Sequence, residues 1–138
     1  MTPEEQKDLD NRLIWAAFDG DTETVQMLLS AGADVHARTD YALHAAARNG
    51  HTETVKILAK HIFAPDSWRG KNRADIEGEA YVLYNRTKVS NPLRPISPEN
   101  LHKAAEILAD CALRCWEQVR PPPPKIQISP LPAQPRAL

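Results

Sequence analysis

The sequence predicts an all-α protein in which pairs of helices stack into a short solenoid, and three observations support this fold class. Asn11–Leu29 and Tyr41–Ala59 are identical at nine of nineteen aligned positions, including a Thr-Glu-Thr-Val tetrapeptide that starts at Thr22 and again at Thr52. Apolar residues in both segments recur at helical spacing. Glycines follow the predicted helices in each segment. A fixed repeat period of this size indicates units that bury their apolar faces on one another.

The first unit opens with a helix that we expect to run from Pro3 to about Phe18. Thr2 can cap this helix, Pro3 suits its first position, and Glu5 completes a capping box. Its apolar face is predicted to consist of Leu9, Leu13 and Ala16.

A second helix is predicted to start at Asp21 or Thr22 and to end before Gly32, which supplies the left-handed conformation of a C-cap. The second unit repeats this plan. Asp40 is expected to cap its inner helix, and its outer helix is expected to reach about His61. Small alanines on both inner helices allow neighbouring helices to approach closely, which favours stacking.

These residues carry a family resemblance. The stretch from Leu43 to His51, with Val55 to Leu58 after it, resembles the core of an ankyrin repeat, and Leu13 to Ala37 resembles another. The period of 30 residues is shorter than the usual 33 or so of that family. The missing residues fall between Ala37 and Leu43, so the resemblance implies a shortened inter-repeat connection without a full projecting finger.

Two repeats need a partner surface to bury their exposed apolar face, and the sequence offers two further helices for that role. We expect them over residues 72–88 and 98–119, with the loop Asn91–Pro95 between them. The second of these should bury a stripe made of Leu101, Ala105, Leu108, Ala112, Cys115 and Val119. The predicted organisation is therefore a repeat region with an N-terminal helical extension over residues 1–61, capping helices within 62–120, and a tail at 121–138.

The tail contains seven prolines in its eighteen residues, so we expect an extended, disordered segment rather than a helix or central strand. Its proline clusters have the form of polyproline ligands, although a plain linker or disordered terminus is the alternative.

Composition excludes several function classes. The net charge of −1 gives no global field that favours nucleic acid or a membrane surface. No apolar run approaches the roughly 20 residues of a membrane helix, and the acidic N-terminus does not resemble a targeting signal. We therefore expect a cytoplasmic protein, or one exported by a route that the sequence does not reveal.

Catalytic, cofactor and metal motifs are missing from the sequence. Cys111 and Cys115 could present two thiolates to a metal, but further ligands at zinc spacing are lacking, so we interpret both as buried core residues. His44 and His51 are interpreted as structural. No enzyme activity, no cofactor and no metal are predicted.

One segment combines basic and aromatic side chains. Residues 69–88 carry Arg69, Lys71, Arg73, Arg86 and Lys88, and Trp68 precedes them. This pairing could contact RNA or DNA, with a base stacked on the indole. The alternative is a surface loop in which Trp68 is anchored against the last repeat.

The resemblance implies non-catalytic protein–protein binding, with contacts on the concave side formed by the inter-repeat connections and the exposed ends of the inner helices. We expect a monomer. The partner protein is not identified; an effector or inhibitor with one target is one possibility, and nucleic-acid binding through residues 69–88 is the alternative function. Carried over by position, the predicted contact residues are Phe18, Asp19, Arg38, Thr39, Asp40, Tyr41, Arg48 and Asn49. Phe18 is the expected aromatic anchor.

Overall fold

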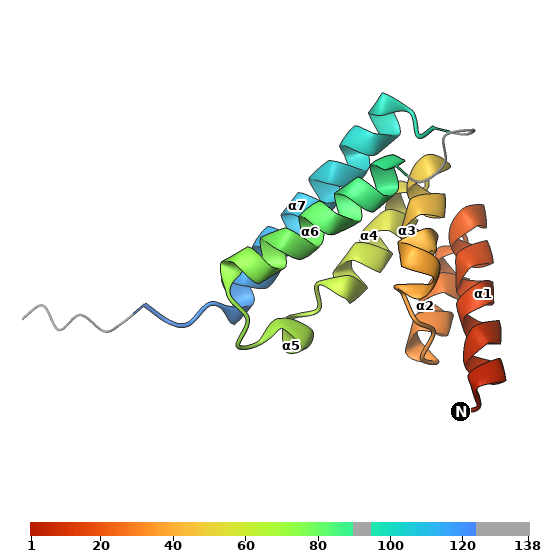
Figure 1. The fold of residues 1–138 in the computed structure, drawn as a ribbon, viewed down its shortest axis with the longest axis horizontal. Coiled ribbons are helices and arrows are strands. Elements are labelled where there is room, and N and C mark those ends of the chain that lie inside the picture. The colour runs from red at the N-terminus through yellow and green to blue at the C-terminus, as the bar shows by residue number, and fades with distance from the viewer. Residues whose placement is uncertain (90–94, 124–138) are drawn as a thin grey trace, which may run out of the picture.

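The computed structural model describes residues 1–89 and 95–123, and every regular element in these ranges is an α-helix (Figure 1). The helices are α1 (Pro3–Asp19), α2 (Thr22–Ser30), α3 (Ala37–Arg48), α4 (Thr52–Ile62), α5 (Pro65–Trp68), α6 (Arg73–Val89) and α7 (Pro98–Val119). The all-α class is confirmed. Most of the predicted loop at 91–95 and of the predicted proline-rich tail lies outside the described residues.

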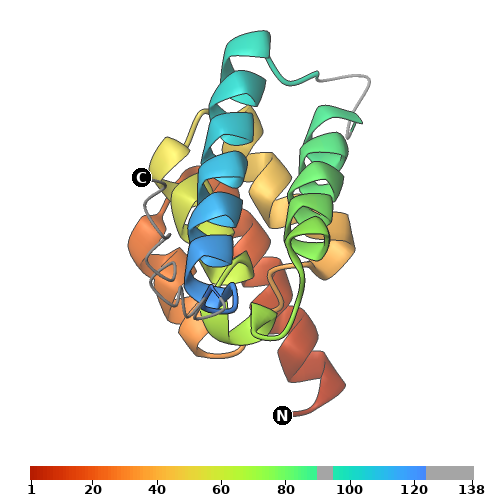
Figure 2. The same cartoon turned by 90° about the vertical axis from the view of Figure 1, so that its left-hand side faces the viewer.

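Three helix pairs stack along the molecule: α1 with α2, α3 with α4, and α6 with α7 (Figures 1 and 2). Helices α1, α3 and α6 pack in succession as an inner layer, and α2, α4 and α7 form the outer layer. The C-terminal pair therefore occupies the place of a further repeat unit and covers the apolar face of the second one. The short helix α5, which the sequence reading did not predict, packs against α7.

Local sequence explains where the helices begin and end. The Thr2 hydroxyl accepts a hydrogen bond from the backbone N–H of Glu5 at 3.1 Å, as the capping motif predicts. Gly20 and Gly50 close the inner helices with φ values of 75° and 73°, a region that disfavours residues with a Cβ atom. Asp21 caps α2 through the N–H of Thr24.

The core is continuous from α1 to α7. Leu13, Leu43 and Leu58 are fully buried at its centre, with repeat alanines between them. On α7 the buried residues are Ala104, Ile107, Leu108, Cys111, Ala112 and Cys115, so Leu101, Ala105 and Val119 of the predicted stripe are only half-buried. The buried face is rotated because α7 packs against α4 as well as α6.

The connection into the second repeat differs from expectation. Arg38, Thr39 and Asp40 have φ values of 53°, 59° and 62°, so three consecutive residues with side chains adopt left-handed backbone conformations. Asp40 does not cap α3 with its side chain and is only 2% exposed. Its carboxylate instead forms an ion pair with Arg86 of α6 and a hydrogen bond with His36. Asp40 is therefore a buried structural residue and not the exposed contact residue that the sequence predicted.

Candidate partner-binding surface

A cleft of about 360 Å³ opens between the inner helices α1 and α3. Its lining residues come from these two helices only: Asn11, Ile14, Trp15, Phe18, Arg38, Tyr41 and Arg48. We call this set the α1–α3 cleft. Two pairs within it, Asn11 with Tyr41 and Phe18 with Arg48, occupy equivalent positions of the two repeats. The cleft is thus a direct product of repeat stacking.

Aromatic side chains form one part of the cleft. The indole of Trp15 is 65% exposed and meets the ring of Phe18 edge-on, with 5.9 Å between ring centroids. Tyr41 is 38% exposed and packs edge-on against His44, at 5.7 Å. Phe18, which the sequence predicts as the anchor, is half-buried. Trp15 therefore presents more aromatic surface to solvent than Phe18 does.

Arginines form the other part. Arg38 is exposed and Arg48 is half-buried, and neither guanidinium has a carboxylate partner among the described residues. The charge of Arg48 acts on a neighbour: burial lowers the pKa of His44, and the positive charge of Arg48 lowers it further. The backbone oxygen of Arg48 accepts a hydrogen bond from Asn100 of α7 at 3.2 Å, which ties the end of α3 to the last helix.

Hydrogen bonds to the backbone oxygen of Phe18 hold the two repeats in register. Asn49 donates its side-chain amide to this oxygen at 3.1 Å, and the Nε2 atom of His51 lies 2.9 Å from it. Asn49 thus has a structural contact beside the cleft. Asp19 and Thr39 are exposed but do not line the cleft, whereas Asp40 is buried and pairs with Arg86 of α6.

The structure brings together four of the eight predicted contact residues: Phe18, Arg38, Tyr41 and Arg48. Sequence reasoning missed three others, Asn11, Ile14 and Trp15. A signal existed for Trp15, because the equivalent position in the second repeat is Ala45, which is fully buried. The second repeat has a buried alanine at this position, so the large, exposed indole of the first repeat is not explained by core packing.

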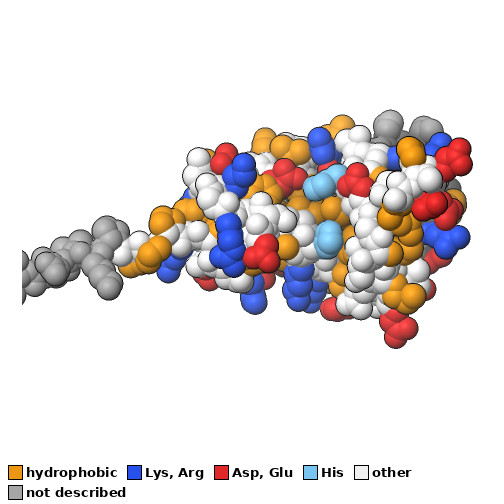
Figure 3. Space-filling model, turned by 90° about the horizontal axis from the view of Figure 1, so that it is seen from below, with side chains coloured by type: hydrophobic (Ala, Val, Ile, Leu, Met, Phe, Trp, Pro, Cys, Tyr) orange, Lys and Arg blue, Asp and Glu red, His pale blue; other side chains and the backbone are white. Residues whose placement is uncertain are grey.

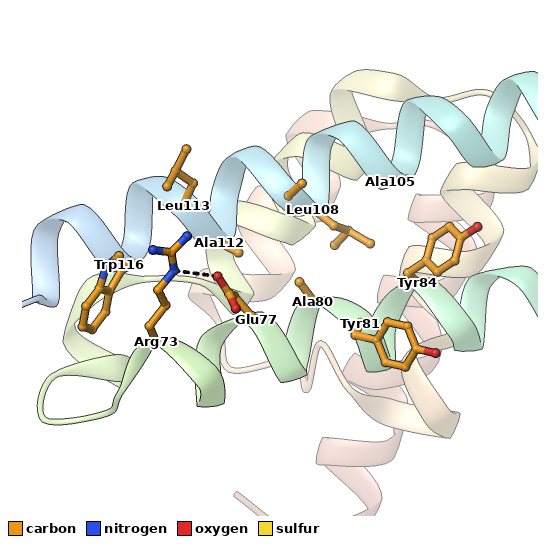
Figure 4. A pocket seen from close by; sticks show the side chains of 11 residues that line it. Arg73, Glu77, Ala80, Tyr81, Tyr84, Ala105, Leu108, Ala112, Leu113 and Trp116 are labelled. Carbon is orange, nitrogen blue, oxygen red and sulfur yellow. Dashed lines mark hydrogen bonds and ion pairs between the residues drawn. The ribbon is translucent and has the colours of Figure 1, made fainter.

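A second hollow, of about 450 Å³, lies between α6 and α7 (Figure 4). Its lining is mostly apolar, with Tyr81, Tyr84 and Trp116 as its aromatic residues. Arg73 and Glu77 form an ion pair at its edge, with 2.6 Å between Nε and Oε1. Tyr81 is 67% exposed, so this hollow offers a matched exposed aromatic away from the α1–α3 cleft.

In the basic segment, residues 68–88, several side chains already form contacts within the molecule. Trp68 stacks on Phe63, with 5.9 Å between ring centroids and 28° between planes, and its indole N–H donates to the backbone oxygen of Ile62 at 2.8 Å. Arg69 pairs with Asp66 at 3.0 Å. On the face shown in Figure 3, acidic and basic side chains are interspersed rather than gathered by sign.

Residues 1–89 and 95–123 offer little support for a metal site, a reactive thiol or a membrane-spanning helix. No cluster of three or more His, Cys, Asp or Glu residues there could hold a metal ion. Cys111 and Cys115 are free thiols in the core, and burial raises the pKa of both. Across the same ranges, the helices are too short or too polar to cross a membrane.

Comparison with protein families settles the repeat type. Residues 13–80 match the family model described as "Ankyrin repeats (3 copies)". This chain is an ankyrin-repeat protein. The ankyrin match extends beyond the two repeats recognised in the sequence and includes α5 and the first part of α6. Ankyrin repeats generally mediate protein–protein interaction. Neither the curated proteins nor the solved structures contain a match to this chain.

Proposed function

We propose that this ankyrin-repeat protein binds another protein through the α1–α3 cleft and has no catalytic role. The observation that supports this function is the convergence of Trp15, Tyr41 and Arg48, with Phe18 and Arg38, in one hollow between successive inner helices. Tryptophan, tyrosine and arginine are the residues most enriched among those that dominate binding energy at protein interfaces.

Trp15 is the proposed anchor of this interface. Its indole is 65% exposed in the free protein, so a partner can remove a large apolar surface from water. The edge-on contact with Phe18 supports the ring from one side. Phe18 itself is tied through its backbone oxygen to the second repeat, so it serves as the floor of the cleft.

A preformed cleft with a fixed set of aromatic and arginine side chains favours one target over a general scaffold, and we propose an effector or inhibitor that acts by occupying its target. We infer that it acts as a monomer. The free thiols of Cys111 and Cys115 are compatible with a reducing compartment, so we propose the cytoplasm as the place of action.

Nucleic-acid binding receives less support from the geometry. The indole of Trp68 already stacks on Phe63, so that face is closed to a base. Arg69, Arg73 and Arg86 each pair with an acidic side chain of the same protein. Of the five cations predicted for a nucleic-acid interface, only Lys71 and Lys88 have no acidic partner among the described residues, so this alternative receives less support than the cleft.

Affinity capture from cells that express the protein tests this function. The wild type should retain a stoichiometric protein partner, and Trp15→Ala should lose it. Tyr81→Ala removes an equally exposed aromatic from the α6–α7 hollow and should keep the partner. Thermal unfolding of both variants checks that the fold is intact. Capture that survives Trp15→Ala but is lost in Tyr81→Ala would move the interface to the other hollow.

A further inference from the structure

The charged residues that line the α1–α3 cleft are all positive. Among the described residues that line it, Arg38 and Arg48 are the only charged ones, and none is a carboxylate. Five other arginines of the described chain pair with a carboxylate, whereas Arg120 has no such partner there. Those that pair with a carboxylate are Arg12, Arg69, Arg73, Arg86 and Arg114.

Arg48 is a cation without a carboxylate partner among the described residues. It is half-buried at the end of α3, and partial removal of its guanidinium from water has a free-energy cost that a carboxylate partner would offset. The fall in the pKa of His44 beside it shows that its charge is felt within this part of the protein. A ligand carboxylate bound here would receive a charge-assisted, two-pronged hydrogen bond.

Arg38 is held beside the cleft by a strained backbone. Three successive residues with Cβ atoms adopt positive φ, from 53° to 62°, a region that is sterically unfavourable for such residues. The Asp40 carboxylate, bound to Arg86 and His36, holds this turn in place. Strained backbone that is maintained by buried contacts clusters at functional sites.

The two cations stand at opposite ends of the α3 wall. The seven helical steps from Tyr41 to Arg48 rise roughly 10 Å at 1.5 Å per residue, and Arg38 precedes them. The aromatic rings of Trp15, Phe18 and Tyr41 lie in the same cleft. This arrangement complements a segment that places an apolar side chain between two acidic ones.

We infer that the partner presents an acidic peptide segment to the α1–α3 cleft, with carboxylates that bind Arg38 and Arg48 and an apolar side chain that packs on Trp15. The inference rests on the proposed function, because it names the chemistry of the partner at that same site.

Selection from a random peptide library displayed on phage tests the inference with the full-length protein as bait. Selected peptides are then synthesised and their affinities measured. The bait variants are Arg38→Gln/Arg48→Gln, which removes both charges, and Trp15→Ala, which removes the anchor. Arg69→Gln/Arg114→Gln is the matched control, because it removes two exposed cations elsewhere.

Asp or Glu should flank an aromatic or aliphatic residue in the selected peptides. Their affinity should fall about 10-fold or more in Arg38→Gln/Arg48→Gln, as expected for two lost charge-assisted contacts, and stay within about 2-fold in the control. High salt should weaken binding to the wild type more than to the neutralised variant.

Two outcomes would count against these ideas in different ways. Peptides that need Trp15 but show no acidic enrichment and no loss with Arg38→Gln/Arg48→Gln would overturn the acidic partner and leave the cleft as a binding site. Failure to select any peptide whose binding depends on Trp15 would contradict the proposed function as well.

Discussion

The imidazole of His51 joins the two recognisable repeats, because its Nε2 atom lies 2.9 Å from the backbone oxygen of Phe18. The same ring covers Gly20, where a Cβ atom would stand 2.5 Å from Nδ1 of His51. The absence of a side chain at Gly20 therefore allows the histidine of the next repeat to reach the end of α1. This contact sets the relative position of the two helices that form the α1–α3 cleft.

Gly20→Ala should destabilise the protein by more than about 1 kcal/mol, because the new methyl group combines a positive φ with a steric clash against His51. Gly78 provides the control. A Cβ atom there meets nothing within 4 Å, so Gly78→Ala within α6 should stabilise the protein by about 0.5–1 kcal/mol. Chemical denaturation of both variants measures the difference. Equal effects of the two substitutions would show that the His51 contact does not constrain Gly20.

Arg86→Ala should lower the free energy of unfolding by about 1–3 kcal/mol, because it leaves the buried carboxylate of Asp40 without its cationic partner. It should also weaken binding at the cleft, since the turn that carries Arg38 depends on Asp40. Arg73→Ala breaks an ion pair between exposed side chains and should cost less than about 1 kcal/mol. Denaturation together with peptide affinity measures both effects. A loss of stability with unchanged peptide affinity would separate the Asp40 contact from the cleft.

Stability should depend on the protonation of His36. The hydrogen bond with Asp40 raises the pKa of His36 above its ordinary 6.5. Partial burial opposes this rise, and the charges of Asp40, Glu79 and Asp34 add smaller contributions to it. The folded state therefore holds this proton more tightly than the unfolded state. The contribution is present below pH 6.5 and is lost as the pH rises through the folded-state pKa.

The measurement is the free energy of unfolding across pH 5 to 9 for the wild type and His36→Gln. The advantage of the wild type should shrink with rising pH. His44 gives the opposite sign, because burial lowers its pKa and the folded state disfavours its protonated form. Relative to His44→Gln, the wild type should lose stability as the pH falls below 6.5. Parallel curves for the wild type and His36→Gln would show that the Asp40 contact is not linked to protonation.

The repeat region could be predicted from the sequence because its signals are local. The nine identities fix the leucines, alanines and glycines of two helix pairs, and each residue type has one evident role in a stacked helical unit. Ser97 and Pro98 likewise placed the start of α7, where the Ser97 hydroxyl accepts from the N–H of Asn100 at 3.2 Å.

Contacts between distant residues could not be predicted in the same way. Asp40 has the local pattern of a helix cap, yet its partner Arg86 lies 46 residues away on a helix whose packing the sequence does not specify. The same reason explains why the sequence did not predict Trp15 as a contact residue. The exposure of a side chain depends on which surfaces the neighbouring helices cover. That Trp15 stays exposed is therefore visible only in the assembled fold.

The central claim is that the partner touches the α1–α3 cleft. Site-specific photocross-linking tests it most directly, with a photoreactive phenylalanine derivative in place of Trp15 in one protein and of Tyr81 in another, each exposed to light in cells. One protein should become covalently attached to the position-15 probe and none to the position-81 probe. Cross-linking of the partner at position 81 alone would contradict the assignment and place the interface between α6 and α7.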